Sequence, residues 1–274
     1  MSQHQIILAD SRRMPELADE SVHLAVTSPP YWSIKDYARP DQIGYNQEYK
    51  PYLESLHRVL AETHRVLYPG CRAAINIGDQ YLRAKDHGRY RVQPIPADIV
   101  GHAREIGFDF MGNIIWQKIS TTRTTGGGAW MGSTYWPRDG HITYEHEYII
   151  LLRKQGDWPK PTPEQKKKSR LTKQQRSDWF RGIWRIPPDS QNDHSAKFPV
   201  EIPRRLIMMY SFWGETVLDP FLGSGTTALA AQQTGRNSVG YEINPDFKPL
   251  ICDKIRSGDG LFNDPPDITL TTRS

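Results

Sequence analysis

The sequence has few cysteines, no long apolar run and little net charge, and each absence excludes a class of protein. Two cysteines in 274 residues, Cys71 and Cys252, are too few for a disulfide framework or a structural zinc site, so we expect both to pack in a core and no metal to be bound. No apolar stretch is long enough to span a membrane. The first residues, MSQHQIILAD, lack the basic and apolar regions of a signal peptide, which favours a reducing cytoplasm.

The net charge of +4 conceals an uneven distribution. The stretch from Arg153 to Arg185 holds eleven lysines and arginines against three acids, whereas the rest of the chain carries 24 basic and 28 acidic residues. A basic segment on a mildly acidic body is typical of a polyanion-binding lobe on a larger domain. A solvated, disordered lysine loop is the alternative interpretation of EQKKKSR.

Apolar patterning predicts strands that alternate with helices around one sheet. A Gly- and Thr-rich loop at residues 119–143 lacks this periodicity and is expected to be functional. The tail after Gly258, rich in proline and aspartate, is expected to be loosely packed. We expect strands at residues 6–9, 22–26, 71–78, 110–118, 144–154, 179–186, 215–219 and 238–243, and helices at residues 49–67, 96–106, 200–210, 226–233 and from 246.

The hexapeptide TSPPYW, residues 27–32, follows an apolar strand at the point where α/β sheets bind ligands. Two prolines make a stiff turn and leave carbonyl oxygens free to accept hydrogen bonds. Ser28 adds a hydroxyl group, and Tyr31 and Trp32 offer flat faces for stacking. These groups suit a planar heterocycle that carries an amino group. The alternative is a Pro-Pro turn whose aromatic residues pack in the core.

A second motif, ETVLDPFLGSGTTALAA at residues 215–231, combines a strand, a glycine turn and a helix start. Gly223 and Gly225 let the backbone approach a ligand closely, and Glu242 ends the next strand, where it can accept hydrogen bonds from a ribose. The motif predicts a nucleoside-cofactor half-site. It leaves a nicotinamide enzyme open, because Gly223, Gly225 and Ala228 also satisfy the dinucleotide fingerprint.

The two motifs together, TSPPYW early and DPFLGSGTT late, resemble the permuted, β-class S-adenosylmethionine-dependent DNA amino-methyltransferases. NIIWQK, YEHEYIILLRK and HSAKFPVEIPRRLI extend the resemblance over nearly the whole chain. The resemblance implies a Rossmann-like, doubly wound and mostly parallel sheet with an inserted basic target-recognition region. It divides the chain into a catalytic half (1–153), the insertion (154–190), a cofactor-binding half (191–257) and a tail (258–274).

The resemblance also implies how the cofactor, S-adenosylmethionine, is held. Asp219, Phe221, Gly223 and Gly225 would line its methionine end, and Glu242 its ribose. Asp10 would approach the adenine amino group, although LADS replaces the usual GDS or GDA and a turn-capping aspartate is the alternative. HSAKFP stands where the family has HPTQKP, which adds the side chains of His194, Ser195 and Lys197 to the expected cofactor contacts.

In the resembling family the target base leaves the duplex and is methylated without a covalent enzyme intermediate. Tyr31 would stack on the base, while the Ser28 hydroxyl and the Pro29 carbonyl, in the turn completed by Pro30, accept hydrogen bonds from its amine. Members with serine before the two prolines tend to methylate cytosine at N4, so we expect N4-cytosine, with N6-adenine as the alternative. Outside this class, the alternatives are a nicotinamide oxidoreductase and a non-catalytic DNA-binding protein.

Double-stranded DNA is therefore the expected partner, with a separate restriction endonuclease as a further partner. We expect the protein to be a monomer or homodimer in a prokaryotic cytoplasm. Lysines and arginines of the basic segment would neutralise phosphates, and forked or flat side chains would read base edges. The phosphate contacts expected are Lys166, Lys167, Lys168, Arg170, Lys173 and Arg176, and the base contacts are Arg181, Trp184, Arg185, Arg123 and Trp130. Core packing is the alternative for each tryptophan.

Overall fold

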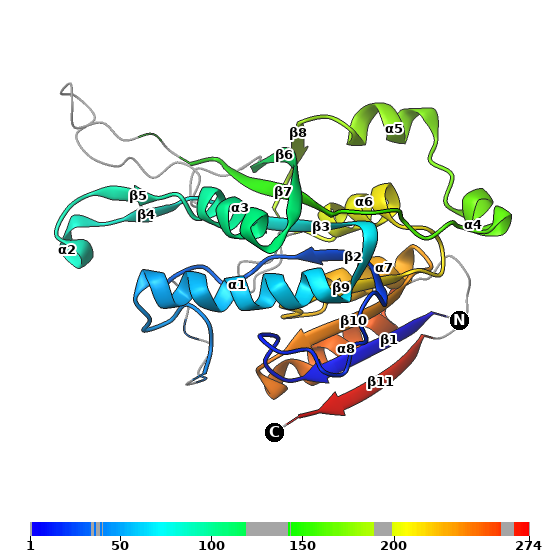
Figure 1. Ribbon diagram of the computed structural model, residues 1–274, viewed down its shortest axis with the longest axis horizontal. Coiled ribbons are helices and arrows are strands. Elements are labelled where there is room, and N and C mark those ends of the chain that lie inside the picture. Colours follow the sequence, from blue (N-terminus) through cyan, green and yellow to red (C-terminus); the bar gives the residue numbers. More distant parts are fainter. Residues whose placement is uncertain are drawn as a thin grey trace.

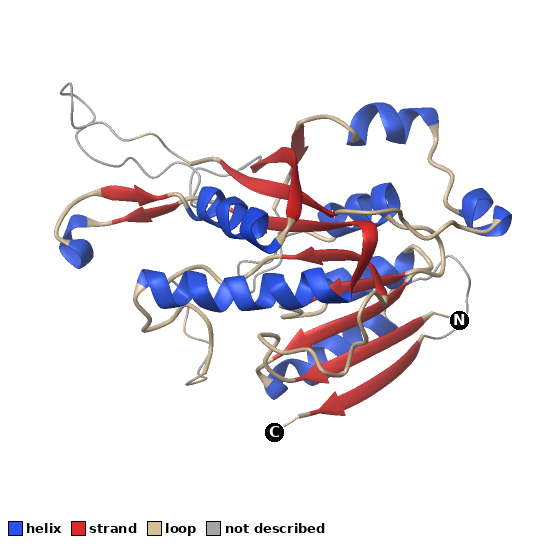
Figure 2. Cartoon of the chain, in the orientation of Figure 1, coloured by secondary structure: helices blue, strands red, loops and turns tan. Residues whose placement is uncertain are grey.

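The computed structural model describes residues 2–33, 36, 39, 41–118, 142, 144–188, 199–258 and 266–273, and its centre is a nine-stranded sheet (Figures 1 and 2). The strands are β1 (Gln3–Leu8), β2 (Val22–Thr27), β3 (Leu67–Ile77), β4 (Gln80–Leu82), β5 (Arg91–Gln93), β6 (Phe108–Lys118), β7 (His146–Lys154), β8 (Ile183–Ile186), β9 (Thr216–Asp219), β10 (Asn237–Glu242) and β11 (Asp267–Thr272). The helices are α1 (Tyr49–Val66), α2 (Ala84–His87), α3 (Ile95–Ile106), α4 (Pro163–Lys168), α5 (Lys173–Trp179), α6 (Glu201–Tyr210), α7 (Thr226–Gln233) and α8 (Lys248–Arg256).

The sheet is mostly parallel and doubly wound, as the sequence predicts. Its strand order is β11-β1-β10-β9-β2-β3-β7-β6-β8, in which β7 alone runs antiparallel to its neighbours β3 and β6. The chain moves outward from β2 to β3 in one direction and from β9 to β10 in the other, so the winding reverses between β2 and β9. A ligand crevice is expected at the carboxyl ends of the strands beside such a reversal.

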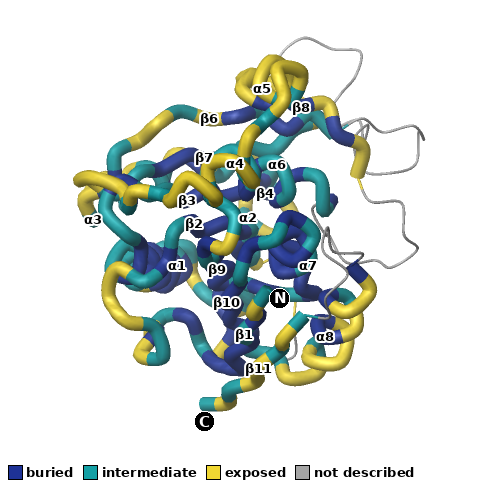
Figure 3. The backbone as a smooth tube through the Cα atoms, turned by 90° about the vertical axis from the view of Figure 1, so that its right-hand side faces the viewer, coloured by how far each residue is buried: buried dark blue, intermediate teal, exposed yellow. Residues whose placement is uncertain are grey.

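Successive residues of each central strand point to opposite faces of the sheet, and each face has its own core. Ala25 of β2 packs in the cluster that includes α1 and α3, whereas Leu24 and Val26 pack in the cluster that includes α6 and α7. Figure 3 shows the buried strands enclosed between these helix layers, with α5 exposed at the surface. Cys252 is buried and Cys71 half-buried, and both are free thiols.

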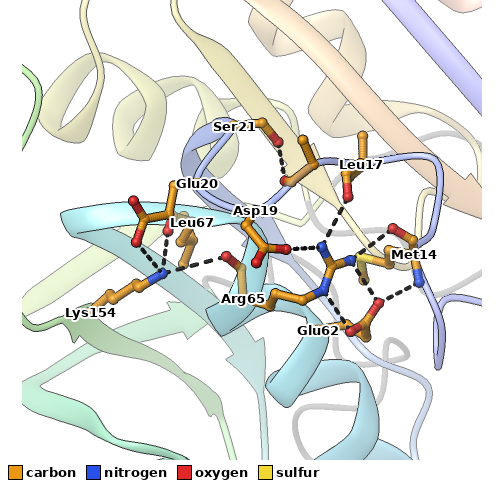
Figure 4. Close-up of polar contacts among 10 residues, drawn as sticks. Met14, Leu17, Asp19, Glu20, Ser21, Glu62, Arg65, Leu67 and Lys154 are labelled. Atoms are coloured by element: carbon orange, nitrogen blue, oxygen red, sulfur yellow. Dashed lines mark hydrogen bonds and ion pairs between the residues drawn. The ribbon is translucent and has the colours of Figure 1, made fainter.

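Ion pairs fix the amino ends of the strands (Figure 4). Arg65, near the end of α1, donates to the carbonyl oxygens of Met14 and Leu17 and to the carboxylate of Glu62. Lys154 ends β7 and donates to the Leu67 carbonyl at 2.8 Å. The first lysine of the predicted basic lobe therefore has a structural role.

The expectation of a loosely packed tail is wrong for residues 266–273. Strand β11 pairs in parallel with the whole of β1, from Gln3 opposite Asp267 to Leu8 opposite Thr272. Arg273 then donates to the carboxylate of Glu16 and to the carbonyl of Asp10. The sequence DITLTT gives little sign of this strand, because an edge strand with two half-exposed faces needs no apolar alternation.

Two predicted boundaries also need correction. The expected strand at residues 179–186 begins only at Ile183, because Trp179 ends helix α5. Trp184 is 1% exposed and its indole N–H donates to the Trp179 carbonyl at 2.9 Å, so it packs in the core and cannot contact a base as predicted. Strand β3 begins at Leu67, four residues earlier than expected, because α1 passes into it without a loop. No helix among the residues that the structure describes could span a membrane.

Candidate active site

A pocket opens at the carboxyl ends of β1, β2, β9 and β10, beside the reversal of the winding. Its cavity volume is about 150 Å³. It brings together the loops after all four strands, including the two motifs that the sequence singles out. The wall is formed by Ala9, Asp10, Ser11, Ser28, Pro30, Gln42, Ile43, Pro220, Phe221, Leu222, Gly223, Ser224, Thr226, Tyr241, Glu242 and Ile243.

The glycine turn after β9 is held by a buried carboxylate. Asp219 Oδ1 accepts hydrogen bonds from the Thr27 hydroxyl at 2.7 Å and from the Phe221 N–H at 3.0 Å, which ties β2 to the turn. Burial raises the pKa of Asp219. Gly225 does not line the pocket, but it has φ +85° at the start of α7, and a Cβ there would lie 3.1 Å from Ile251 Cγ2. A side chain would be strained at this position.

Glu242 ends β10 with its carboxylate at the pocket wall. Its Oε2 accepts from the Gly223 N–H and its Oε1 from the Asn244 N–H, both at 2.8 Å. Burial raises the pKa of Glu242 to about 7, and the charge of Asp219 adds to this effect. The two backbone bonds hold the carboxylate where it can accept further hydrogen bonds from a ligand in the pocket.

Asp10 lines the pocket as predicted for a cofactor contact, yet it also caps a turn. Its Oδ1 accepts from the Arg12 N–H at 2.9 Å, and its Oδ2 accepts from Arg12 Nε at 2.7 Å. The backbone hydrogen bond to Oδ1 is the turn cap that the sequence left open as the alternative, and Oδ2 forms an ion pair with the Arg12 guanidinium. A contact with the adenine amine stays a prediction for this side chain.

The TSPPYW loop divides its residues between two cavities. Ser28 and Pro30 line the pocket, and the Pro30 carbonyl accepts a hydrogen bond from the Tyr52 hydroxyl at 2.9 Å. Pro29 borders a smaller apolar cavity beneath α1. Trp32 is 6% exposed and donates to the Gln47 carbonyl at 2.7 Å, so the core-packing alternative holds for this ring.

Tyr31 lies beside the pocket wall in a polar cluster that the sequence did not single out. Its hydroxyl accepts from the Gly78 N–H at 2.8 Å, and burial together with the charge of Glu147 raises its pKa far above the usual value. Glu147 in turn accepts from Asn76 Nδ2 at 2.6 Å and forms an ion pair with Lys118. The signal was a glutamate and a lysine at the facing ends of two otherwise apolar strands, in YEHEYIILLRK and NIIWQK.

The structure does not bring the predicted phosphate contacts close to the pocket. Helix α4 packs on the segment before β9, where Gln165 Nε2 donates to the Trp213 carbonyl at 3.1 Å, and it therefore lies at the amino edge of the sheet (Figure 1). Lys168 pairs with Glu164 at 2.9 Å and lies 3.5 Å from the Trp213 ring centre. The remaining lysines and arginines of this set are exposed: Lys166, Lys167, Arg170, Lys173 and Arg176.

The predicted base contacts lie further along the chain. Arg181 is exposed and donates to the Ser177 carbonyl, whereas Arg185 is at the carboxyl end of the outer strand β8 and donates to Gln117 Oε1 at 3.2 Å. Arg123 and Trp130, and the expected cofactor contacts His194, Ser195 and Lys197, lie outside the described residues.

One group of potential metal ligands occurs among the residues that the structure describes. His57 Nδ1 lies 3.1 Å from His102 Nδ1, and His102 Nδ1 lies 3.5 Å from Glu105 Oε2, between α1 and α3. None of the three lines the pocket, and a hydrogen bond between the two imidazoles accounts for their contact.

A doubly wound sheet whose glycine turn and terminal carboxylate share one pocket defines an α/β enzyme of the nucleoside-cofactor class. The particular family follows from sequence comparison, in which residues 22–253 match the family of N6/N4 DNA methylases. The chain belongs to this DNA methylase family.

Individual relatives are similar over most of their length. Type II methyltransferase M.MjaI of Methanocaldococcus jannaschii is 39% identical, over 92% of this chain and 91% of the relative. Type II methyltransferase M.MthZI of Methanothermobacter thermautotrophicus is 34% identical, over 95% of this chain and 79% of the relative. A solved structure from Thermus thermophilus, described as a DNA modification methylase complexed with S-adenosylmethionine, is 36% identical with a TM-score of 0.79 and covers 99% of this chain and 100% of its own.

Proposed function

We propose that this chain transfers the methyl group of S-adenosylmethionine to the exocyclic N4 amine of cytosine in double-stranded DNA, directly and on a base flipped out of the helix. One observation carries the proposal: Ser28 and Pro30 of the early motif line the same pocket as Gly223 and Glu242 of the late motif. The order of these motifs along the chain is that of the permuted β class. Both halves of a methyl-transfer site therefore meet in one cavity.

S-adenosylmethionine is the cofactor, and the pocket fits its chemistry. The buried Glu242 carboxylate suits a ribose diol, which offers two hydroxyl donors. Gly223 leaves the backbone at the wall open to close approach, and Phe221 adds an apolar surface. The Thermus relative, 36% identical, was solved with this molecule. Ser195 and Lys197 are proposed as further contacts on the resemblance of HSAKFP alone.

The residues of the chain act by positioning the exocyclic amine of the target base. When bound, S-adenosylmethionine supplies a methyl group on a sulfonium, which the amine nitrogen takes while the sulfur leaves as a neutral thioether. The Ser28 hydroxyl and the Pro29 carbonyl accept the two amine hydrogens and orient the nitrogen lone pair, and Tyr31 stacks on the ring. Water takes the surplus proton, which the Ser28 hydroxyl can relay. Orientation of this kind contributes several kcal/mol to a transfer that needs no covalent enzyme intermediate.

The choice of cytosine rests on Ser28, since family members with serine at this position tend to methylate cytosine. A hydroxyl can accept from either amine, so N6-adenine is the alternative within the same mechanism. Membership of the DNA methylase family removes the nicotinamide oxidoreductase, because the matched residues 22–253 include both motifs. A separate endonuclease that reads the same DNA site is the proposed partner, and the chain acts as a monomer or homodimer.

The test is methyl transfer from S-adenosylmethionine labelled in its methyl group. The purified chain is expected to bind S-adenosylmethionine in calorimetry and to transfer label to unmethylated duplex DNA, but not to RNA of the same sequence. The Ser28→Ala variant serves as the control, with cofactor binding retained and transfer reduced. Binding of the cofactor without transfer to any DNA would refute the proposal, and DNA binding by such a protein would identify it as a non-catalytic DNA-binding protein.

A further inference from the structure

A two-stranded arm projects from the same edge of the sheet as the pocket. Strand β3 ends at Ile77, and the chain continues at once into the hairpin of β4 and β5, with the short helix α2 in its connection (Figure 1). The parallel strands that carry the pocket end at this edge, whereas α4 and α5 lie at the opposite one. We call residues 80–93 the arm.

The arm is fixed to the TSPPYW loop both at its base and through α2. Gln80 Nε2 donates to the Trp32 carbonyl at 2.5 Å, and the His87 ring lies 5.4 Å from the Trp32 ring. Two residues before the arm, the Gly78 N–H donates to the Tyr31 hydroxyl. The arm and the proposed catalytic loop therefore hold fixed positions relative to each other.

The outer surface of the arm is basic. Arg83 pairs with Asp86 at 2.9 Å, which neutralises both. Lys85, Arg89 and Arg91 are exposed, and none has an ion pair with any residue that the structure describes. Tyr90, between the two arginines, is 55% exposed. An exposed tyrosine between arginines on a hairpin is a surface that suits a nucleic-acid backbone.

We propose that the arm binds DNA phosphates beside the target base, with Lys85, Arg89 and Arg91 as the phosphate ligands. The inference rests on the proposed function and adds the surface on which the substrate lies. DNA held at the arm is presented to the edge of the sheet where the pocket opens. The predicted contacts on α4 lie at the other edge and cannot position a base in this way.

The experiment compares two double variants that each remove two exposed arginines. Arg89→Gln with Arg91→Gln changes the arm, and Arg58→Gln with Arg104→Gln is the matched control on α1 and α3. Duplex affinity is measured from about 50 to 200 mM salt, and calorimetry with S-adenosylmethionine checks that each variant is folded. Two lost phosphate contacts should reduce the slope of log K against log salt by about 2 and weaken binding on the order of tenfold at low salt. The control should bind as the wild type does.

Failure of the proposed function and failure of the arm proposal give different results. A wild-type protein that binds S-adenosylmethionine but neither binds nor methylates DNA refutes the proposed function, and the arm proposal falls with it. A wild-type protein that methylates DNA, with an arm variant whose salt slope is unchanged, overturns the arm alone. The arm proposal is also overturned if Lys166→Gln with Lys167→Gln on α4 removes the salt dependence of DNA binding while the arm variant behaves as the wild type does.

Discussion

Glu242 couples cofactor binding to pH at the scale of a single residue. Burial raises the pKa of its carboxyl group to about 7, so the group is ionised above this pH and protonated below it. Only the ionised form offers all its oxygen lone pairs to the two ribose hydroxyls. Affinity for S-adenosylmethionine should therefore fall as the pH decreases through about 7.

Calorimetry from about pH 6 to 8 measures this dependence. Glu242→Gln, which cannot ionise, should bind on the order of tenfold more weakly at the upper end of the range, because hydrogen bonds to a charged group are worth about 1.5–3 kcal/mol. It should also lose the pH dependence. An affinity of the wild-type protein that stays constant over the range would contradict the role given to this carboxylate.

Tyr31 is expected to act on the base and not on the cofactor. It lies outside the pocket wall, and its hydroxyl accepts a hydrogen bond from the Gly78 N–H. Tyr31→Phe keeps the stacking ring and should retain most methyl transfer, whereas Tyr31→Ala should reduce it on the order of a hundredfold, since stacking is worth about 1–3 kcal/mol. Both variants should bind S-adenosylmethionine as the wild type does. Equal losses of methyl transfer in the two variants would show that the Tyr31 hydroxyl, and not the stacking ring, is required.

At the scale of elements, the turn from β9 into α7 requires glycine. Gly225 has φ +85° and faces Ile251, so Gly225→Ala should lower the free energy of unfolding by about 1–2 kcal/mol. Gly101, inside α3, has open space where a Cβ would lie, with no other atom within 4 Å, and Gly101→Ala should raise stability by about 0.5–1 kcal/mol. Thermal melting of the two variants provides the comparison. Similar melting temperatures would show that the turn tolerates a side chain.

Elements with strong local signals could be predicted from the sequence, and elements defined by their partners could not. Helix α3 begins with Pro96 in its first turn and ends at Gly107, which has φ +110°, as the pattern predicts. Strand β11 has no such signal, because only its pairing with β1 defines it. The same distinction applies to the residues of the site. The glycine turn is a local motif, whereas Glu147 lies 116 residues after Tyr31 in the sequence and meets Tyr31 only through the sheet.

The basic segment shows a limit of arguments from composition. Its count of lysines and arginines includes Arg153, which pairs with Asp109, and Lys154, which holds the amino ends of the strands. Composition measures charge but not the edge of the sheet on which the charge lies. The shorter arm at residues 80–93 was missed because its arginines are separated by other residues and form no run.

At the scale of the whole molecule, the two ends of the sheet differ in their chemistry. The carboxyl edge combines the pocket, the TSPPYW loop and the arm, whereas the amino edge carries α4 and the Arg65 network (Figures 1 and 4). Charge reversal by Lys166→Glu with Lys167→Glu should weaken DNA binding by long-range repulsion and evenly across sequences, because α4 lies at the edge away from the pocket and cannot read base edges. Filter binding to several duplexes measures this. Lost discrimination with unchanged overall affinity would contradict it.

The central claim is direct methylation of cytosine N4, and the identity of the methylated nucleoside tests it most directly. The protein is incubated with S-adenosylmethionine carrying a deuterated methyl group and with unmethylated genomic DNA, which is then digested to nucleosides for mass spectrometry. The account predicts deuterated N4-methylcytosine, in smaller amount when Ser28→Ala replaces the wild type. Deuterated N6-methyladenine as the only product would contradict the choice of base, and no methylated nucleoside would contradict the proposed reaction itself.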